Sequence, residues 1–169
     1  RDRYVIMYSG NHSPCHPLES VVDAAMKLKE DTRFVFFFVG GGSEHKKIAR
    51  RVEDEGLRNV RCLPYQPVDK LAGSLSAADL HVVVMGEPFV GMIHPCKIYN
   101  ILSISAPFLF IGPEASHVGD LIAKHPDAFL CRRSAQGEVD TIADHIVAIA
   151  DEGGRCLLYT SPSPRDVIQ

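Results

Sequence analysis

Short apolar runs alternate with segments of helical spacing along most of this chain. Residues 34–39 (Phe-Val-Phe-Phe-Phe-Val) are all apolar, which is typical of a strand buried on both faces of a sheet. Residues 19–29 instead place Val22, Ala25 and Met26 on one side of a helix. The alternation predicts a parallel sheet with helices on both faces, the Rossmann-like doubly wound α/β fold. The predicted strands are residues 4–8, 34–39, 60–63, 80–85, 107–111 and 128–131, and the predicted helices are residues 19–29, 43–55, 69–78, 97–103, 114–124 and 140–150.

Residues that favour helix ends mark several of these boundaries. Ser43 and Asp69 each stand where a side chain can cap the first turn of a helix. Gly56 follows the second predicted helix, where helices commonly end on a left-handed residue. In sheets of this type, ligands bind outside the carboxyl ends of the strands. The loops at residues 10–11, 40–42 and 86–95 are therefore the candidate binding loops.

The composition is that of one globular domain. The chain has 169 residues, 46% of them hydrophobic, and its net charge of -3 offers no basic excess for a nucleic-acid backbone. The longest apolar run, residues 34–39, is too short to span a bilayer, and no signal peptide is visible. The five cysteines are widely spaced and odd in number, which favours a reducing cytoplasm over a disulfide framework or a zinc site.

The end of the chain has a different character. After residues 153–154 (Gly-Gly), the sequence Arg-Cys-Leu-Leu-Tyr-Thr-Ser-Pro-Ser-Pro-Arg-Asp matches no element type. It resembles a translated sequencing adapter, so we predict a domain over residues 1–154 and a non-native tail over residues 155–169. A natural linker rich in serine and proline is the alternative.

Residues 97–107 read Lys-Ile-Tyr-Asn-Ile-Leu-Ser-Ile-Ser-Ala-Pro. This stretch is similar to the Pro-Ser-Lys-Ile-Tyr-Asn-Ile-Leu-Ala-Ala-Gly-Lys-Pro segment of retaining glycosyltransferases of the group-1 (family 4) class, and other stretches resemble the same class in the same order. Residues 8–11 resemble its first glycine turn, residues 37–42 its Val-Gly-x-Gly strand end, and residues 59–65 and 77–80 its Asn-Val-x-Phe-x-Gly and Ala-Asp-hydrophobic signatures. The resemblance covers roughly residues 4–125. It implies the C-terminal, nucleotide-sugar-binding half of a two-domain GT-B enzyme.

The resemblance implies a site for the diphosphate of a sugar nucleotide. A diphosphate needs backbone N–H donors and positive charge, which a glycine turn and a helix N-terminus supply. The predicted phosphate-binding residues are Gly10, Asn11 and His12 in the turn, together with Lys97. Lys97 would stabilise the charge that develops on the leaving nucleoside diphosphate. The alternative for Lys97 is a solvated lysine in the first turn of a helix.

The chain departs from the commonest pattern of the class at two places. Most members carry a Glu-x7-Glu motif whose second glutamate binds the ribose, and here that position holds Asn100, which we predict to bind the ribose hydroxyls. Met92 occupies the position of the first glutamate. Many members also place an arginine and a lysine after the first strand, where this chain has His12 and His16. These departures resemble the fucosaminyl- and colanic-acid-type transferases of bacterial polysaccharide synthesis.

The remaining contacts implied by the resemblance concern the base and the sugar. The base would meet Pro64, Tyr65 and Gln66, with the Tyr65 ring stacked on it; a core position for this aromatic residue is the alternative. Glu87 would accept from a sugar hydroxyl, or else be a solvated carboxylate. The predicted sugar-binding residues are Glu87, Phe89, Gly91, Ile93 and His94.

These expectations together predict the donor-binding domain of a retaining glycosyltransferase that uses a UDP- or GDP-linked sugar. Since the chain has no Asp-x-Asp pair, no metal is expected, and the nucleotide sugar is the one small-molecule partner. The acceptor site and a catalytic-side histidine would belong to an N-terminal domain that this chain lacks, so the isolated chain is expected to be inactive. The expected location is the cytoplasm, with any contact to the inner face of the membrane made through that other domain. The alternatives are a nucleotide-binding Rossmann domain of another class, such as half of a sugar-nucleotide epimerase, and a dinucleotide oxidoreductase, although the Gly-x-Gly-x-x-Gly spacing is missing.

Overall fold

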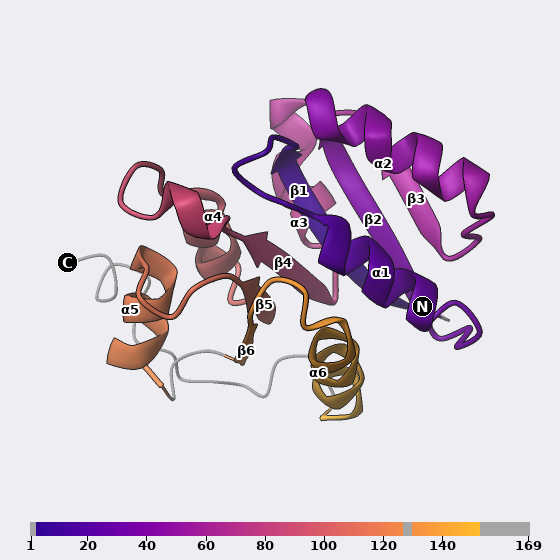
Figure 1. Ribbon diagram of the computed structural model, residues 1–169. Helices are drawn as coiled ribbons and strands as arrows, with labels where there is room; N and C mark the ends of the chain where they lie inside the picture. Colours follow the sequence, from indigo (N-terminus) through magenta and orange to yellow (C-terminus); the bar gives the residue numbers. More distant parts are fainter. Residues whose placement is uncertain (1–2, 127–129, 153–169) are drawn as a thin grey trace.

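In the computed structural model, which describes residues 3–126 and 130–152, the chain forms a six-stranded sheet flanked by helices (Figure 1). Every pair of neighbouring strands runs parallel, in the order β3-β2-β1-β4-β5-β6. This arrangement confirms the predicted doubly wound α/β fold. The strands are β1 (Tyr4–Asn11), β2 (Phe34–Gly41), β3 (Val60–Leu63), β4 (Leu80–Val84), β5 (Phe108–Ile111) and β6 (Cys131–Ser134).

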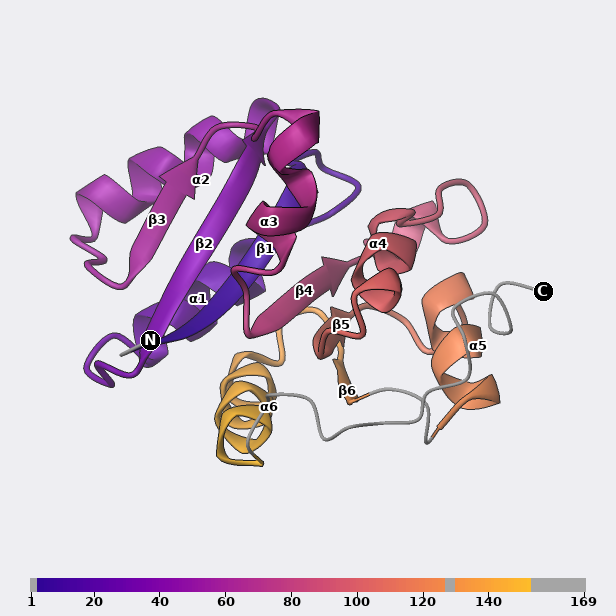
Figure 2. The same cartoon turned by 180° about the vertical axis from the view of Figure 1, so that it is seen from behind.

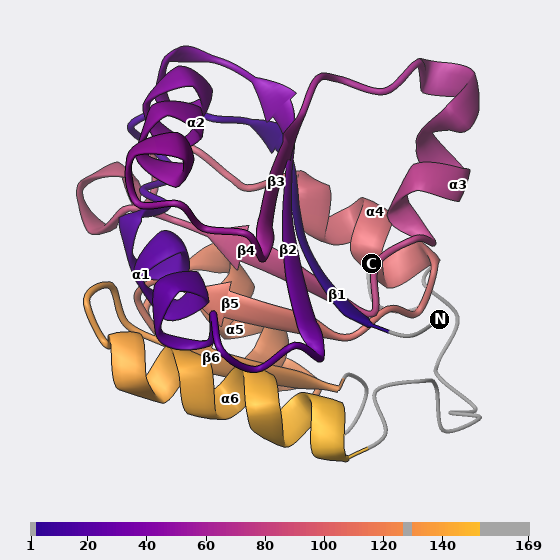
Figure 3. The same ribbon diagram turned by 90° about the vertical axis from the view of Figure 1, so that its right-hand side faces the viewer.

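Helices cover both faces of the sheet. On one face lie α1 (Glu19–Lys27), α2 (Ser43–Asp54) and α6 (Val139–Asp151), and α3 (Leu71–Leu75) and α4 (Lys97–Ser103) lie on the other (Figure 3). Seen from behind, α3 and α4 stand in front of the strands, with α5 (His117–Lys124) beyond α4 (Figure 2). Two short 3-10 turns, η1 (Val68–Lys70) and η2 (Glu87–Phe89), precede α3 and α4.

Two apolar clusters hold these layers together. In the larger cluster, alternate residues of β1 and β2 such as Ile6, Phe36 and Phe38 pack against α1, α2 and α6. In the second, Phe108 and Phe110 of β5 pack against α4 and α5. Residues on both faces of the central strands are therefore buried, which explains why these strands are apolar at nearly every position.

The structure differs from the predicted boundaries mainly at helix N-termini. Ser43 is the first residue of α2 and makes no capping hydrogen bond, because Gly42 with a φ of 121° brings the chain into the helix instead. The predicted helix 69–78 is divided into η1 and α3, and Asp69 lies inside η1 rather than capping a helix. Ser116 caps α5 with its side chain, so this helix begins three residues later than predicted. Gly56, with a φ of 62°, follows α2 as predicted.

The last predicted segments are described in part. The predicted strand 128–131 overlaps β6, although residues 127–129 lie outside the described residues. The predicted tail, residues 155–169, lies outside them as well. Across the described ranges, no helix has both the length and the apolar character needed to cross a membrane.

Candidate functional site

The candidate site lies where the chain leaves β1 and β4 in opposite directions, towards β2 and towards β5. In open α/β sheets the loops after two such strands diverge, and ligands bind between them. Residues 12–17, which follow β1, connect the end of β1 to the end of β4 through hydrogen bonds. The carbonyl oxygen of Cys15 accepts a hydrogen bond from the backbone N–H of Gly86 at 2.9 Å, and Nδ1 of His16 lies 2.8 Å from the carbonyl oxygen of Val84. The loop after β1 is thereby fixed to the end of β4.

Three glycines shape the turn at the ends of β1 and β2. Gly10 and Gly40 are paired in the sheet register, with φ values of 141° and 140°, and Gly42 has a φ of 121°. All three values lie in the region that favours glycine. A Cβ atom on Gly42 would lie 2.3 Å from the backbone oxygen of His12. The loop from β1 therefore passes directly over the end of β2, and only glycines allow this approach.

Lys97, the first residue of α4, reaches the end of β1. Its Nζ atom lies 3.3 Å from the centroid of the Tyr8 ring, and a Cβ atom on Gly10 would lie 3.1 Å from the same Nζ. The ammonium group is buried and has no hydrogen-bond partner among the described residues. Burial lowers the pKa of Lys97 to about 7. The fold thus brings together two predicted phosphate-binding residues, Gly10 and Lys97, although they are far apart in the sequence.

The third predicted phosphate ligand, His12, has a fully buried ring. Its Nδ1 atom lies 2.9 Å from the carbonyl oxygen of Gly10, and its ring packs against the rings of Tyr8 and His45, with both centroids 4.8 Å away. Burial, and next the neighbouring His45, lower the pKa of His12 to about 4, so the ring is neutral at pH 7. These contacts fix the backbone of the glycine turn from its buried side. A direct contact between His12 and a phosphate stays a prediction.

The other predicted ligands of the ribose and phosphates lie on the surface. Asn100 is exposed and stands three residues after Lys97, so both side chains start from the same side of α4. Asn11 is exposed at the end of β1, and its carbonyl oxygen accepts a hydrogen bond from the Tyr8 hydroxyl at 2.8 Å.

The predicted base-binding residues follow β3. Tyr65 is 59% exposed, which excludes the alternative of a core position for this ring. It lies beside the end of β2, since a Cβ atom on Gly41 would be 3.0 Å from the Tyr65 ring. Pro64 is exposed, and its carbonyl oxygen accepts a hydrogen bond from the side-chain amide of Gln66 at 3.1 Å. Stacking of Tyr65 on a base stays a prediction.

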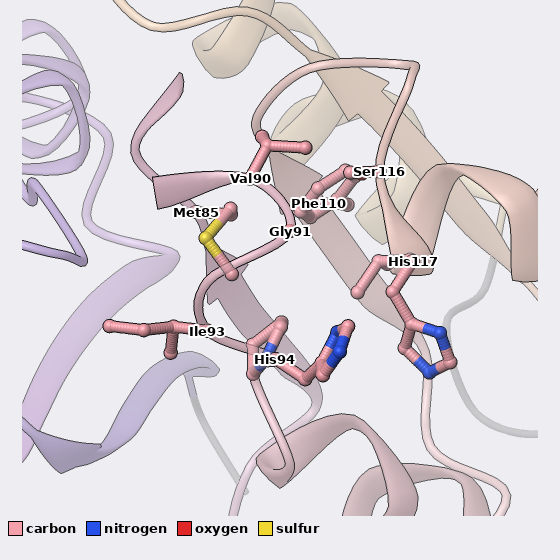
Figure 4. Close-up of a pocket in the computed structure, with 10 residues that line it drawn as sticks. Met85, Val90, Gly91, Ile93, His94, Phe110, Ser116 and His117 are labelled. Atoms are coloured by element: carbon pink, nitrogen blue, oxygen red, sulfur yellow. The ribbon is translucent and has the colours of Figure 1, made fainter. Parts of the chain in front are cut away.

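The predicted sugar-binding residues divide into two groups. Phe89 and Ile93 pack against the apolar cluster of α4 and α5, where they support the loop after β4. Glu87, Gly91 and His94 are exposed. Figure 4 shows that Gly91, Ile93 and His94 line a small pocket, which Ser116 and His117 close from the side of α5.

Two histidines that line this pocket, and a tyrosine hydrogen-bonded to one of them, form a polar group that the sequence alone did not indicate. The rings of His94 and His117 are 5.0 Å apart, and the Tyr99 hydroxyl lies 2.5 Å from Nε2 of His117. These residues come from the loop after β4, from α4 and from α5, and no motif links them. Within residues 3–126 and 130–152, no group of three or more histidine, cysteine or carboxylate side chains is arranged to hold a metal ion.

No protein-family profile matches this sequence. Among curated proteins, the chain is similar to the putative colanic acid biosynthesis glycosyl transferase WcaI of Escherichia coli (strain K12), with 28% identity over 130 residues. The alignment covers 77% of this chain and 32% of WcaI. The chain therefore spans about a third of the length of this curated relative.

Solved structures show the same fold at lower identity. The C-terminal domain of the group 1 glycosyl transferase family protein LpcC from Francisella tularensis has a TM-score of 0.68 at 13% identity, with 98% of this chain and 84% of that chain covered. A mutant of S. aureus TarM, solved in a complex that includes UDP, has a TM-score of 0.69 at 17% identity, with 99% of this chain and 34% of that chain covered. The matched part of LpcC is a C-terminal domain, and the six-stranded sheet described above corresponds to it.

Proposed function

We propose that this chain, which is the C-terminal domain of a group-1 GT-B glycosyltransferase and a distant homologue of WcaI, binds the nucleoside diphosphate of a sugar donor. The proposed site is the edge of the sheet formed by the carboxyl ends of β3, β2, β1 and β4. The diphosphate would lie over the glycine turn, with Gly10, Asn11 and Lys97 as its ligands. His12, whose ring is fully buried, would have to turn outward to join them.

The observation that carries the proposal is the buried ammonium group of Lys97. It has no hydrogen-bond partner in the described part of the chain. Removing an ammonium group from water costs several kcal/mol unless an anion or hydrogen bonds compensate for the lost hydration. A group with this cost, at the ligand-binding edge of the sheet, is better explained by an anionic ligand than by stability. A diphosphate supplies the required negative charge.

The order of the predicted contacts along the sheet supports the same ligand. Tyr65, with Pro64 and Gln66, stands after β3 on one side of the glycine turn, and the loop with Glu87 stands after β4 on the other. A nucleotide sugar has the same order of base, diphosphate and sugar. We infer that the base lies at β3, that Asn100 binds the ribose, and that the sugar lies among Glu87, Phe89, Gly91, Ile93 and His94.

The activity of the whole enzyme belongs to this proposal as well. We infer transfer of a UDP- or GDP-linked sugar with retention of configuration and without a metal ion, in the synthesis of a bacterial polysaccharide or glycoconjugate. The acceptor would bind to an N-terminal domain across a cleft, in the cytoplasm, and any membrane contact would be made through that domain. The chain alone should therefore transfer no sugar. Detectable transfer by the purified chain would contradict this part of the proposal.

Isothermal titration of the chain with UDP, GDP and NAD tests the site directly. We expect UDP or GDP to bind and the Lys97→Ala variant to lose roughly ten- to a hundredfold in affinity, since a charge-assisted contact contributes about 1.5–3 kcal/mol. Lys29→Ala is the matched control, because Lys29 is an exposed lysine just after the C-terminus of α1. Equal binding to the wild type and to Lys97→Ala would remove Lys97 from the site. Binding of NAD alone would favour an oxidoreductase instead.

A further inference from the structure

The ammonium group of Lys97 lies where a ligand does not reach it. Its Nζ atom is buried, close to Gly10 and 3.3 Å from the centroid of the Tyr8 ring. A phosphate oxygen is about as large as a water oxygen, so an atom that water does not reach is not reached by a phosphate either. For Lys97 to contact a diphosphate, its ammonium group has to leave the Tyr8 ring.

The Tyr8 ring provides a favourable contact for the ammonium group in this position. An ammonium over the face of an aromatic ring is attracted by the negative charge of that face, and the attraction grows when water is excluded. The ring is itself fixed, since Tyr8 is 1% exposed and its hydroxyl donates to the carbonyl oxygen of Asn11 at 2.8 Å. The interaction is weaker than a contact with a phosphate, so a diphosphate can draw the lysine away.

We propose that Tyr8 is a positioning residue that holds Lys97 at rest, and that Lys97 moves onto the donor diphosphate with uptake of a proton from solvent. This inference rests on the proposed function, because the diphosphate is the anion that draws the lysine out.

The groups that surround Lys97 explain why its side chain would take up a proton when it moves to the diphosphate. The titratable groups that face it are Tyr8 of β1, His12 and His16 of the following loop, and His81 of β4. Burial lowers the pKa of all three histidines, to about 4 for His12 and His81, and the positive charge of Lys97 lowers them further. No carboxylate in the described ranges raises the pKa of Lys97, and burial lowers it to about 7. Near pH 7 the resting lysine is therefore partly neutral, whereas a lysine against a diphosphate is charged.

Titration calorimetry with UDP and GDP at pH 7, 8 and 9, each in two buffers of different ionisation enthalpy, measures this proton. We expect proton uptake on binding, and affinity that falls by up to about tenfold for each pH unit above 7. The terminal phosphate of the nucleotide, with a pKa of about 6, is already ionised over this range. His12 and His81 stay neutral over the same range and add no proton of their own.

Three variants test whether the proton is taken up by Lys97 and whether Tyr8 holds the lysine in place. Lys97→Arg keeps a permanent charge, so it should bind with no proton uptake and with the same affinity from pH 7 to 9. Tyr8→Phe keeps the aromatic face and should behave as the wild type does. Tyr8→Leu removes that face, so the charged form at rest is less favoured and the fall in affinity should begin at a lower pH.

The possible results separate this inference from the proposed function. Binding of UDP or GDP with constant affinity and no proton uptake would overturn the inference and leave the donor site in place. Proton uptake that persists in Lys97→Arg would assign the proton to another group, which also overturns it. If neither nucleotide binds at any pH, the donor site itself is wrong and the inference fails with it.

Discussion

The carbonyl oxygen of Gly10 lies 2.0 Å from the point where a Cβ atom on Gly40 would stand. The two residues are direct partners in the register of β1 and β2, and both have φ values near 140°. Because the obstructing atom belongs to the backbone, no change of side-chain rotamer relieves the contact. The glycine turn therefore depends on both residues for its shape, and the proposed diphosphate site depends on the turn.

Gly40→Ala should destabilise the domain by roughly 2–4 kcal/mol, since it combines a backbone clash with an unfavourable φ. Urea denaturation followed by circular dichroism measures this loss. Gly73→Ala is the matched control: this glycine lies in α3, and a Cβ atom there would meet nothing within 4 Å. The control should be neutral or more stable by about 0.5–1 kcal/mol, as expected for glycine replaced by alanine in a helix. Equal effects of the two substitutions would show that the turn tolerates a side chain at position 40.

Tyr99→Phe should weaken the contact between α4 and α5. The Tyr99 hydroxyl lies 2.5 Å from Nε2 of His117 in a partly buried setting, and a net hydrogen bond of this kind contributes about 0.5–1.5 kcal/mol. His117→Ala would remove the same hydrogen bond together with the ring contact to His94. A double-mutant cycle with Tyr99→Phe and His117→Ala should give a coupling energy of similar size. A coupling energy near zero would show that the two side chains do not interact in solution.

Lys97→Met should make the unliganded domain more stable. The pKa of Lys97 falls from 10.5 to about 7 on folding, so between these values the unfolded chain binds more protons than the folded one. Stability of the wild type should then rise with pH from about 7 to 10, and the variant, which has no ammonium group, should lack this rise. At pH 7 the variant should be more stable by a few kcal/mol, and the difference should shrink towards pH 10. Thermal denaturation at a series of pH values measures both trends, and a variant less stable than the wild type at pH 7 would contradict them.

Much of the fold follows from local sequence because the central strands are buried on both faces. The first six residues of β2 are all apolar, which indicates a buried strand, and two glycines end the strand. The helix predicted over residues 69–78 was less accurate for a physical reason. In α3, Leu75 is the only buried residue of five, so the sequence there carries little helical periodicity.

The candidate site could be predicted less completely than the fold. The proximity of Gly10 and Lys97 follows from the rule that the ends of parallel strands meet at one edge. The buried ring of His12 does not follow from any such rule, because it depends on how three glycines fold the loop back over β2. The contact between Tyr99 and His117 likewise depends on how α4 and α5 pack, which no local pattern specifies.

Binding of inorganic pyrophosphate separates contacts to the phosphates from contacts to the base and the ribose, because pyrophosphate has the diphosphate of the donor without the other two groups. Lys97→Ala should weaken binding of both pyrophosphate and the nucleotides, since its contact is to the phosphates. Tyr65→Ala should weaken nucleotide binding by about 1–3 kcal/mol, as for other aromatic side chains that stack on a base, and leave pyrophosphate binding unchanged. Asn100→Ala should likewise weaken binding of the nucleotides alone, by about 1 kcal/mol, and Asn100→Glu should restore their binding.

For Tyr65→Ala the matched control is Tyr65→Phe, since it keeps the aromatic ring. If Tyr65→Ala weakens pyrophosphate and UDP equally, the ring supports the glycine turn through Gly41 and does not bind the base.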